Sequence, residues 1–167
     1  MKICRLILIV PLLAFITGCY LPISGKVIDA ETQQPIEDAV VMVEWTKTHG
    51  FGHYWTESYK VVEVVSDKEG RVKIDGCYSF FVNKPHVTVY KKGYVAWNDE
   101  EIFRGPPRTD FKWGDHIFRL EHFKPEYSYN AHVFFIRSSI HSAQNLESKQ
   151  KIYKAFDWET HLARQKD

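Results

Sequence analysis

The segment from Thr48 to Trp55 holds the residue types best suited to chemistry. It reads THGFGHYW and places His49 and His53 four residues apart, with glycines between them that would let the backbone fold back. Two imidazoles could then bind one metal ion, but a closed zinc site needs four ligands and an open one needs three. Further ligands would be Glu57, His86, His116 or His122. The alternative to such a metal site is a flexible aromatic loop.

The same segment also supports a surface of aromatic rings. Flat rings stack on sugar faces and on apolar peptide side chains, and Tyr and Trp are favoured at interfaces. Aromatic residues make up 15% of the chain, so the alternative is that many of them fill the core. Two long loops supply the rings: Phe51, Tyr54, Trp55 and Tyr59 from one, and Trp97, Phe103, Phe111 and Trp113 from the other. The candidate ligand-binding residues are therefore His49, His53, Tyr54, Trp55, Trp97 and Trp113.

Nucleophilic catalysis has little support in the sequence. A buried or unreactive thiol is expected at Cys77, because a reactive thiolate needs an accessible, electropositive environment. Ser138 and Ser139, with His141 nearby, are equally typical of helix capping. The chain contains no Gly-x-Ser-x-Gly, His-Glu-x-x-His or phosphate-binding glycine loop. We therefore expect no catalytic residue, no cofactor and no enzyme activity.

The first 19 residues, MKICRLILIVPLLAFITGC, are typical of a secretory signal. Their apolar run of about 11 residues is shorter than the roughly 20 residues that a membrane-spanning helix needs. The stretch Ile16-Thr17-Gly18-Cys19 resembles the lipobox of bacterial lipoproteins. This resemblance implies that the signal peptide, residues 1–18, is removed and that Cys19 is acylated, with several chains for lasting attachment. The alternative is ordinary secretion with an incidental thiol at Cys19.

The residue after the cysteine bears on the membrane that holds the protein. In Gram-negative lipoproteins an aspartate at that place usually signals inner-membrane retention, whereas this chain has Tyr20. The resemblance therefore implies the outer membrane. Cys4 leaves with the signal peptide and Cys19 is acylated, so Cys77 would be the single thiol of the mature chain and no internal disulfide could form.

The composition is that of a folded chain. Its 167 residues are 44% hydrophobic, and 22 basic side chains balance 21 acidic ones for a formal charge of +1. These values are far from those of disordered chains. A charge near zero argues against nucleic-acid binding as the main activity. The length corresponds to roughly one domain of about 100–200 residues.

Alternating β-branched and polar residues predict a β-sandwich over residues 23–137, after a lipidated N-terminus and linker at 19–22. Ala39, Val41, Val43 and Trp45 would share one face and meet Val87 and Val89 in the core. Asp67-Lys68-Glu69-Gly70 predicts a tight turn within a β-hairpin. Strands are expected near 23–29, 39–45, 59–66, 71–75, 86–91 and 116–121, with further extended pieces near 94–97 and 131–137.

The period of the pattern changes in residues 138–167. Residues that would share one helical face now recur every three or four positions: Ile140, Ala143, Leu146, Lys149, Ile152, Tyr153 and Phe156. This spacing predicts an amphipathic helix, with Ser138 or Ser139 as its N-cap. Asp157 could cap a second short helix from Trp158 to Gln165. We expect this tail to pack on the sandwich, and the alternative is a helix that binds a partner.

An ordered set of residues resembles the carboxypeptidase regulatory-like domain. The set is Gly25, Val27, Asp29, Thr32, Pro35, Ile36, Ala39 and Val41, then Asp67, Gly70 and Val72, then Val87, Val89, Gly93 and Tyr94. The resemblance covers about residues 23–97 and implies a transthyretin-like, or prealbumin-like, β-sandwich. Each matched residue can be explained by a structural role, such as Asp29 accepting hydrogen bonds from the amides of a turn. None is a catalytic group, and a fold does not determine an activity.

One enzyme shares this sandwich, the 5-hydroxyisourate hydrolase branch of transthyretin-like proteins. That branch ends in a Tyr-Arg-Gly-Ser tetrapeptide, whereas this chain ends in Ala-Arg-Gln-Lys-Asp. The resemblance therefore implies a module for binding, spacing or stabilising. We expect an envelope lipoprotein, held in the membrane by acylated Cys19, that contacts another envelope protein. The alternative is carbohydrate or metal binding by the loop at residues 48–59.

Overall fold

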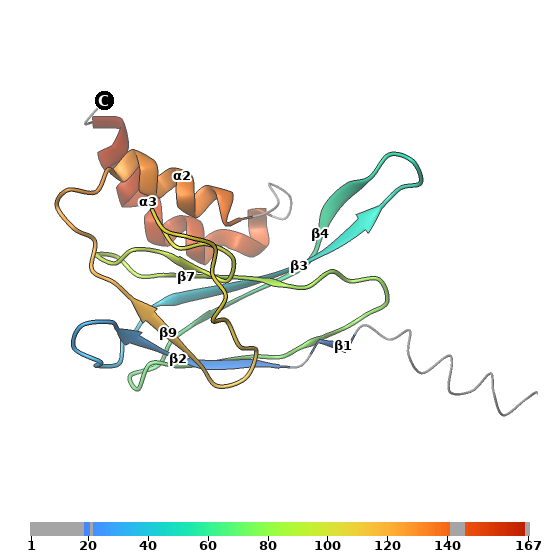
Figure 1. Cartoon of the computed structure of the whole chain (residues 1–167), viewed down its shortest axis with the longest axis horizontal. Coiled ribbons are helices and arrows are strands. Elements are labelled where there is room, and N and C mark those ends of the chain that lie inside the picture. Colours follow the sequence, from blue (N-terminus) through green and yellow to red (C-terminus); the bar gives the residue numbers. More distant parts are fainter. Residues whose placement is uncertain (1–18, 21, 141–145, 166–167) are drawn as a thin grey trace, which may run out of the picture.

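The protein has three layers, two β-sheets and a pair of helices (Figure 1). This computed structural model describes residues 19–20, 22–140 and 146–165, so the predicted signal peptide lies outside the described residues. The strands are β1 (Cys19–Tyr20), β2 (Ile23–Asp29), β3 (Val40–His49), β4 (Trp55–Val65), β5 (Arg71–Ile74), β6 (Cys77–Tyr78), β7 (His86–Tyr90), β8 (Trp97–Asn98) and β9 (His116–Leu120). The helices are α2 (Tyr129–Ser138), the 3-10 turn η1 (Leu146–Lys149) and α3 (Gln150–Gln165).

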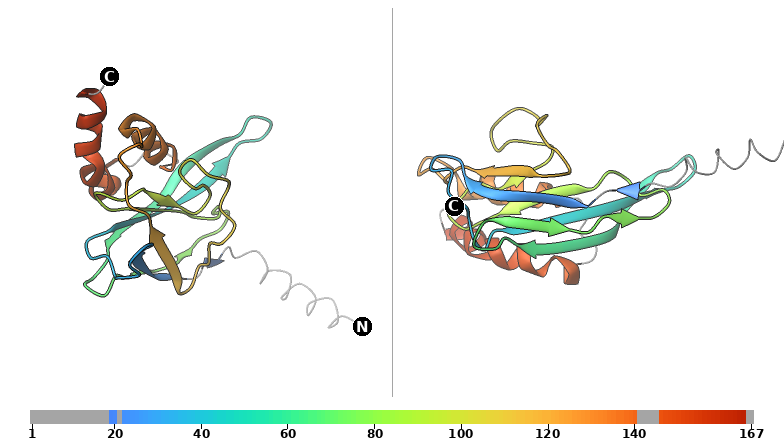
Figure 2. Two further views of the ribbon diagram at one scale, coloured as in Figure 1. Left: turned by 60° about the vertical axis from the view of Figure 1, so that its left-hand side comes forward. Right: turned by 90° about the horizontal axis from the view of Figure 1, so that it is seen from below.

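The two main sheets pack face to face, which confirms the predicted mainly β sandwich. One has the order β5-β2-β9 and the other β4-β3-β7-β8, while β1 and β6 form a separate two-stranded ribbon. In the smaller sheet β2 is antiparallel to β5 and parallel to β9. Both views in Figure 2 place the helices against the larger sheet, on the side away from β2 and β9. The order of the layers is therefore small sheet, large sheet, helices.

Strand β3 lies at the centre of the molecule and is buried on both faces. Val41, Val43 and Trp45 face the small sheet, as the alternation predicts, and each is fully buried. Val40 and Met42 face the other way, into a second core under the helices. A strand between two cores accounts for the nearly continuous apolar run, because neither face meets water.

The C-terminal tail packs on the sandwich, as predicted. Ile152 and Phe156 of α3 and Ile136 of α2 are buried in the core they share with β3. Large apolar side chains point inward from both helices, and Phe134, 75% exposed, is the one on the described helical residues that does not. The tail therefore uses its apolar stripe inside the molecule rather than for a partner.

The predicted bounds of the helices are wrong. Residues 131–137, expected to be extended, belong to helix α2, whose N-cap is Ser128, and Ser139 ends this helix instead of beginning one. The valine, isoleucine and phenylalanines in this segment have a local preference for strands. Their spacing also suits one buried face of a helix, and packing against the sheet overrides the local preference. Asp157 lies in the middle of the single helix α3 and caps nothing. Residue 141, considered as a partner of the two serines, falls outside the described residues.

The turn at Asp67 is confirmed, but the hairpin is wrong. Asp67 Oδ1 accepts hydrogen bonds from the amides of Glu69 and Arg71, and Gly70 has a φ of +74°. The strands on either side of the turn do not pair, because β4 belongs to the large sheet and β5 to the small one. The turn therefore carries the chain across the sandwich, where a Cβ on Gly70 would clash with the carbonyl oxygen of Val27.

Asp29 ties together several segments at the end of the sandwich where β2 finishes. Its Oδ1 accepts the amides of Glu31 and Thr32, both at 2.8 Å, which confirms the predicted turn. Its Oδ2 accepts the hydroxyl of Tyr94 at 3.0 Å and lies 2.8 Å from His122 Nε2. The hydrogen bond from Thr32, assisted by Glu31, Tyr94 and His122, outweighs burial and lowers the pKa of Asp29 from 3.8 to about 2.

This depressed pKa predicts part of the acid sensitivity of the fold. Stability from the ionised Asp29 is present above the unfolded value of 3.8 and is lost as the pH falls towards 2. Asp29→Ala should lower the free energy of unfolding by about 1–3 kcal/mol at neutral pH, and Asp29→Asn by less, because an amide oxygen still accepts. Urea unfolding of the wild type and both variants, at neutral and acidic pH, measures these free energies. Equal acid sensitivity in the wild type and in Asp29→Ala contradicts the assignment.

Candidate functional site

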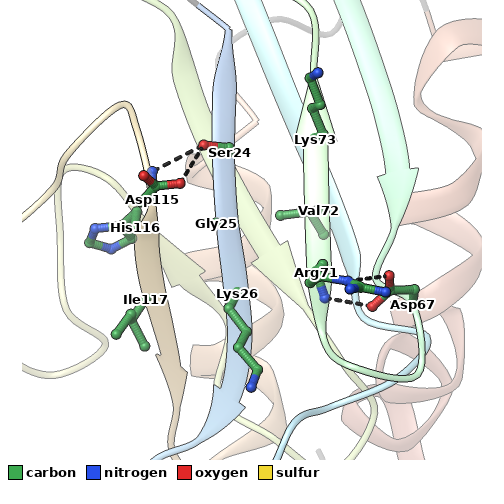
Figure 3. A pocket seen from close by; sticks show the side chains of 10 residues that line it. All are labelled: Ser24, Gly25, Lys26, Asp67, Arg71, Val72, Lys73, Asp115, His116 and Ile117. Atoms are coloured by element: carbon green, nitrogen blue, oxygen red, sulfur yellow. Dashed lines mark hydrogen bonds and ion pairs between the residues drawn. The ribbon is translucent and has the colours of Figure 1, made fainter.

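The outer face of the β5-β2-β9 sheet is bare, because the helices cover the other sheet (Figures 1 and 2). We call this surface the open face. A shallow hollow of about 590 Å³ lies on it between β2, β5 and β9. Figure 3 shows the residues that line it: Ser24, Gly25, Lys26, Asp67, Arg71, Val72, Lys73, Asp115, His116 and Ile117.

The charges of the open face are unevenly compensated. Arg71 is held by Asp67 and Glu69, each at 2.9 Å, and the amide of Arg71 helps to lower the pKa of Asp67. Lys26 and Lys73 are exposed on the neighbouring strands and form no ion pair among the described residues. Ile117 lies on β9, on the other side of β2 from Lys73, where it pairs in register with Lys26 and is 41% exposed. The open face can therefore receive a surface that combines acidic groups with an apolar contact.

The β3-β4 hairpin brings together part of the predicted loop site. His49 Nε2 lies 2.9 Å from Glu57 Oε1, and the His49 ring stacks on Trp55 at 5.6 Å. His53 and Tyr54 are exposed at the tip, and Tyr54 is 68% exposed. In both Figure 1 and Figure 2 the hairpin extends beyond the body of the sandwich. The hairpin thus displays rings, as predicted.

The second loop does not supply the rest of the predicted platform, and this is a correction. Trp97 is 3% exposed and packs edge-on against Phe111 and Phe118, with the Arg108 guanidinium 4.5 Å from its ring centre. Trp113 and Phe111 pack against the sandwich core, and Phe103 packs against the core under the helices. The loop between β8 and β9 folds back over the sheet edge, so these rings fill the molecule instead of facing a ligand.

The predicted metal ligands are spread over the molecule. Among residues 19–20, 22–140 and 146–165, no three His, Cys, Asp or Glu side chains are grouped to hold a metal ion. His116 lies among aromatic rings, where burial lowers its pKa, and the amide of Lys112 donates to its Nδ1 at 3.3 Å. His86 pairs with Glu100 at 3.2 Å, and His122 pairs with Asp29. The structure therefore does not bring these imidazoles together.

One cluster has catalytic residue types but no access to a substrate. Tyr90, His132 and Glu159 are hydrogen bonded to one another through Glu159 between β7, α2 and α3, and all three side chains are fully buried. Cys77, the thiol considered as a nucleophile, is free and buried, as expected. Residues of this kind sealed inside a core stabilise the fold.

The sequence reasoning missed three exposed rings, one at the end of β6 and two in the connection from β6 to β7. Tyr78, Phe80 and Phe81 are 70%, 54% and 79% exposed. Backbone pairing places them beside the hairpin and the N-terminal ribbon, because Val82 bridges Lys47 and Cys19 pairs with Tyr78. The signal was readable in the sequence as two adjacent phenylalanines in a segment without charges, residues 76–83.

Comparisons with known proteins leave the family open. No protein-family model and no curated protein matches the chain, so the carboxypeptidase regulatory-like resemblance stays a prediction. Solved structures with a similar backbone include a streptococcal ancillary pilin, with 17% sequence identity and a TM-score of 0.34. The alignment covers 65% of this chain and 30% of that one. Another is the shaft pilin SpaA from Lactobacillus rhamnosus GG, with 19% sequence identity and a TM-score of 0.32. This alignment covers 63% of this chain and 45% of the pilin.

The chain spans less than half the length of these two pilins. At such TM-scores the likeness carries no inference about what this protein does. Within the described part of the chain, no helix is both long enough and apolar enough to cross a bilayer.

Proposed function

We propose that the protein is an envelope lipoprotein, anchored by acylated Cys19, whose β-sandwich is a non-catalytic module that binds another envelope protein on its open face. The observation that carries the proposal is the uneven covering of the sandwich. One sheet is buried under α2 and α3, whereas the other presents Lys26, Lys73 and Ile117 around a shallow hollow. The lipobox at residues 16–19 and the regulatory-like motif of residues 23–97 support the same proposal.

The chemistry of the open face indicates the kind of partner. Two lysines without a charged partner in the described structure favour an acidic surface, and exposed Ile117 on the edge strand β9 favours an apolar side chain beside it. The hollow is wide and shallow rather than enclosed, which suits a protein surface better than a small molecule. We therefore expect a protein partner with a patch of Asp and Glu next to an apolar residue.

Site-specific crosslinking in cells tests this function. A photoreactive amino acid at Ile117 should give a covalent adduct of one defined mass in the envelope fraction, because this exposed side chain would lie within the interface. The same amino acid at exposed Phe134, on the helical layer, should give none.

Charge reversal identifies the contact. Lys26→Glu with Lys73→Glu should reduce the yield of the Ile117 adduct about tenfold, since like charges would then oppose the acidic partner. Lys154→Glu, an exposed substitution on α3, is the matched control and should leave the yield unchanged. An adduct from Phe134 alone, or one that is insensitive to the reversal, contradicts the open face as the binding surface.

A further inference from the structure

The large apolar side chains exposed on the protein are concentrated at one end of the sandwich. The strand directions place the start of β2, the hairpin tip and the connection from β6 to β7 together there (Figure 1). Seven of the eleven exposed large hydrophobic side chains in the described residues lie at this end. We call them the aromatic end: Phe51, Tyr54, Trp55, Tyr59, Tyr78, Phe80 and Phe81.

The chain enters the fold at the same place. Cys19 pairs with Tyr78 across the β1-β6 ribbon, so their Cα atoms are about 5 Å apart. Phe81 follows three residues later and lies within roughly 11 Å more along the chain. The headgroup region on each side of a bilayer is about 5–8 Å thick. An acyl chain on Cys19 would therefore bring Tyr78, Phe80 and Phe81 within reach of the headgroups.

The two loops of the aromatic end carry no charged side chain, and charges such as Lys47 and Glu57 lie on the hairpin strands behind the tip. Residues 50–55 and 76–83 contain no Asp, Glu, Lys or Arg, whereas the turns at the opposite end include Asp67, Lys68, Glu69, Lys91 and Lys92. Charged groups are costly to bring towards a membrane, while Tyr, Trp and Phe are favoured at its surface. This contrast favours the aromatic end as the one that faces a bilayer.

The backbone turns at Phe81, where two adjacent rings are both exposed. Phe81 has a φ of +58°, a region that residues other than glycine seldom adopt. Two successive residues of a strand would point to opposite faces, but here the rings of Phe80 and Phe81 are both exposed, with centroids 6.5 Å apart. The backbone thus presents a pair of rings at the end where Cys19 lies.

We infer that the aromatic end lies against the lipid bilayer that holds Cys19, with its rings among the headgroups and the open face directed sideways. This inference rests on the lipid anchor of the proposed function and adds a second contact with the membrane. The module then stands upright on the membrane instead of moving freely on a tether. In this orientation the open face is accessible to a partner beside the protein.

Fluorescence quenching by lipid tests the orientation. The acylated full-length chain, in a Cys77→Ala background, is labelled with an environment-sensitive fluorophore at Phe81→Cys or, as a control at the opposite end, at Lys92→Cys. It is reconstituted into phosphatidylethanolamine–phosphatidylglycerol vesicles with brominated acyl chains. We expect at least about threefold stronger quenching at position 81, because the quencher lies within the bilayer.

Flotation of the same vesicles separates the two claims. A protein that does not float contradicts the anchor, and with it the orientation. A protein that floats but is quenched equally at positions 81 and 92 overturns the orientation alone, including the case in which the rings cover a second copy. A probe at Tyr54→Cys should lose most of its quenching in the double variant Phe80→Ser, Phe81→Ser but not in Phe134→Ser.

Discussion

Replacing Lys149 with alanine is expected to lower the free energy of unfolding by about 3–5 kcal/mol. Lys149 Nζ donates to Glu44 Oε1 at 2.8 Å, and both side chains are fully buried between β3 and the start of α3. Without the ammonium group, the Glu44 carboxylate would stay in the core as an uncompensated charge. Urea unfolding monitored by circular dichroism measures the loss.

A double variant shows how much the intact Glu44–Lys149 ion pair contributes to stability, as distinct from the loss when one partner is removed. Glu44→Leu with Lys149→Met should recover most of the stability, because two apolar side chains of similar volume replace the ion pair without leaving a buried charge. Lys154→Ala, at an exposed position of the same helix, should change the stability by less than about 0.5 kcal/mol. A loss below about 1 kcal/mol for Lys149→Ala would show that Glu44 does not depend on this lysine.

Replacing Glu159 with alanine should cost about 3 kcal/mol and loosen the helices from the sheet. Glu159 Oε1 accepts the hydroxyl of Tyr90 at 2.7 Å, and its Oε2 lies 2.6 Å from His132 Nδ1. The amide of Ala96 donates to His132 Nε2 at 2.8 Å, so the His132 proton is on Nδ1 and points at Glu159. The carboxylate thus joins β7, α2 and α3.

The protonation of Tyr90 supports this network. Burial, together with the adjacent Glu159 carboxylate, raises the pKa of Tyr90 far above its usual range. The phenol therefore remains a donor to Glu159, while Trp158 Nε1 donates to its oxygen at 2.9 Å. Removing Glu159 leaves two buried donors, on Tyr90 and His132, without their acceptor.

Hydrogen exchange distinguishes local loosening from a global effect. In Glu159→Ala the amides of α2 and α3 should exchange faster than those of β3 and β7, because the lost contacts lie between the helices and the sheet. Glu159→Gln keeps one acceptor and should lose about half as much stability. Asp157→Ala, which removes an exposed pair with His161, is the control and should change little. Unchanged exchange in α2 and α3 of Glu159→Ala contradicts this role.

Local pattern was enough to predict the sandwich but not how its helices attach. The alternation from Ala39 to Trp45 identifies the inner face of β3, because period 2 is a property of the backbone. The partner of Glu44 is 105 residues away in sequence, and no local signal connects it with Lys149. Such long-range pairs depend on how the tail docks, which the residues near Glu44 do not specify.

The candidate site was predictable in part for a similar reason. Exposed rings at the hairpin tip follow from a glycine-rich segment between two strands, so the exposure of Tyr54 and Trp55 was predictable. Trp97 was not, because its burial depends on the long loop from β8 to β9 folding back over it. The exposed pair Phe80-Phe81 was overlooked although its segment lacks charges, since two adjacent aromatic residues also fit a buried strand.

Intact-mass analysis of the protein extracted with detergent from the envelope tests the central claim most directly. The lipid-anchored module predicts a chain that begins at Cys19 and carries fatty acyl groups on that residue. It also predicts that Cys19→Ser removes this mass and releases the protein from the membrane. A water-soluble chain with an unmodified Cys19, or one that retains residues 1–18, contradicts the anchor and the orientation that depends on it.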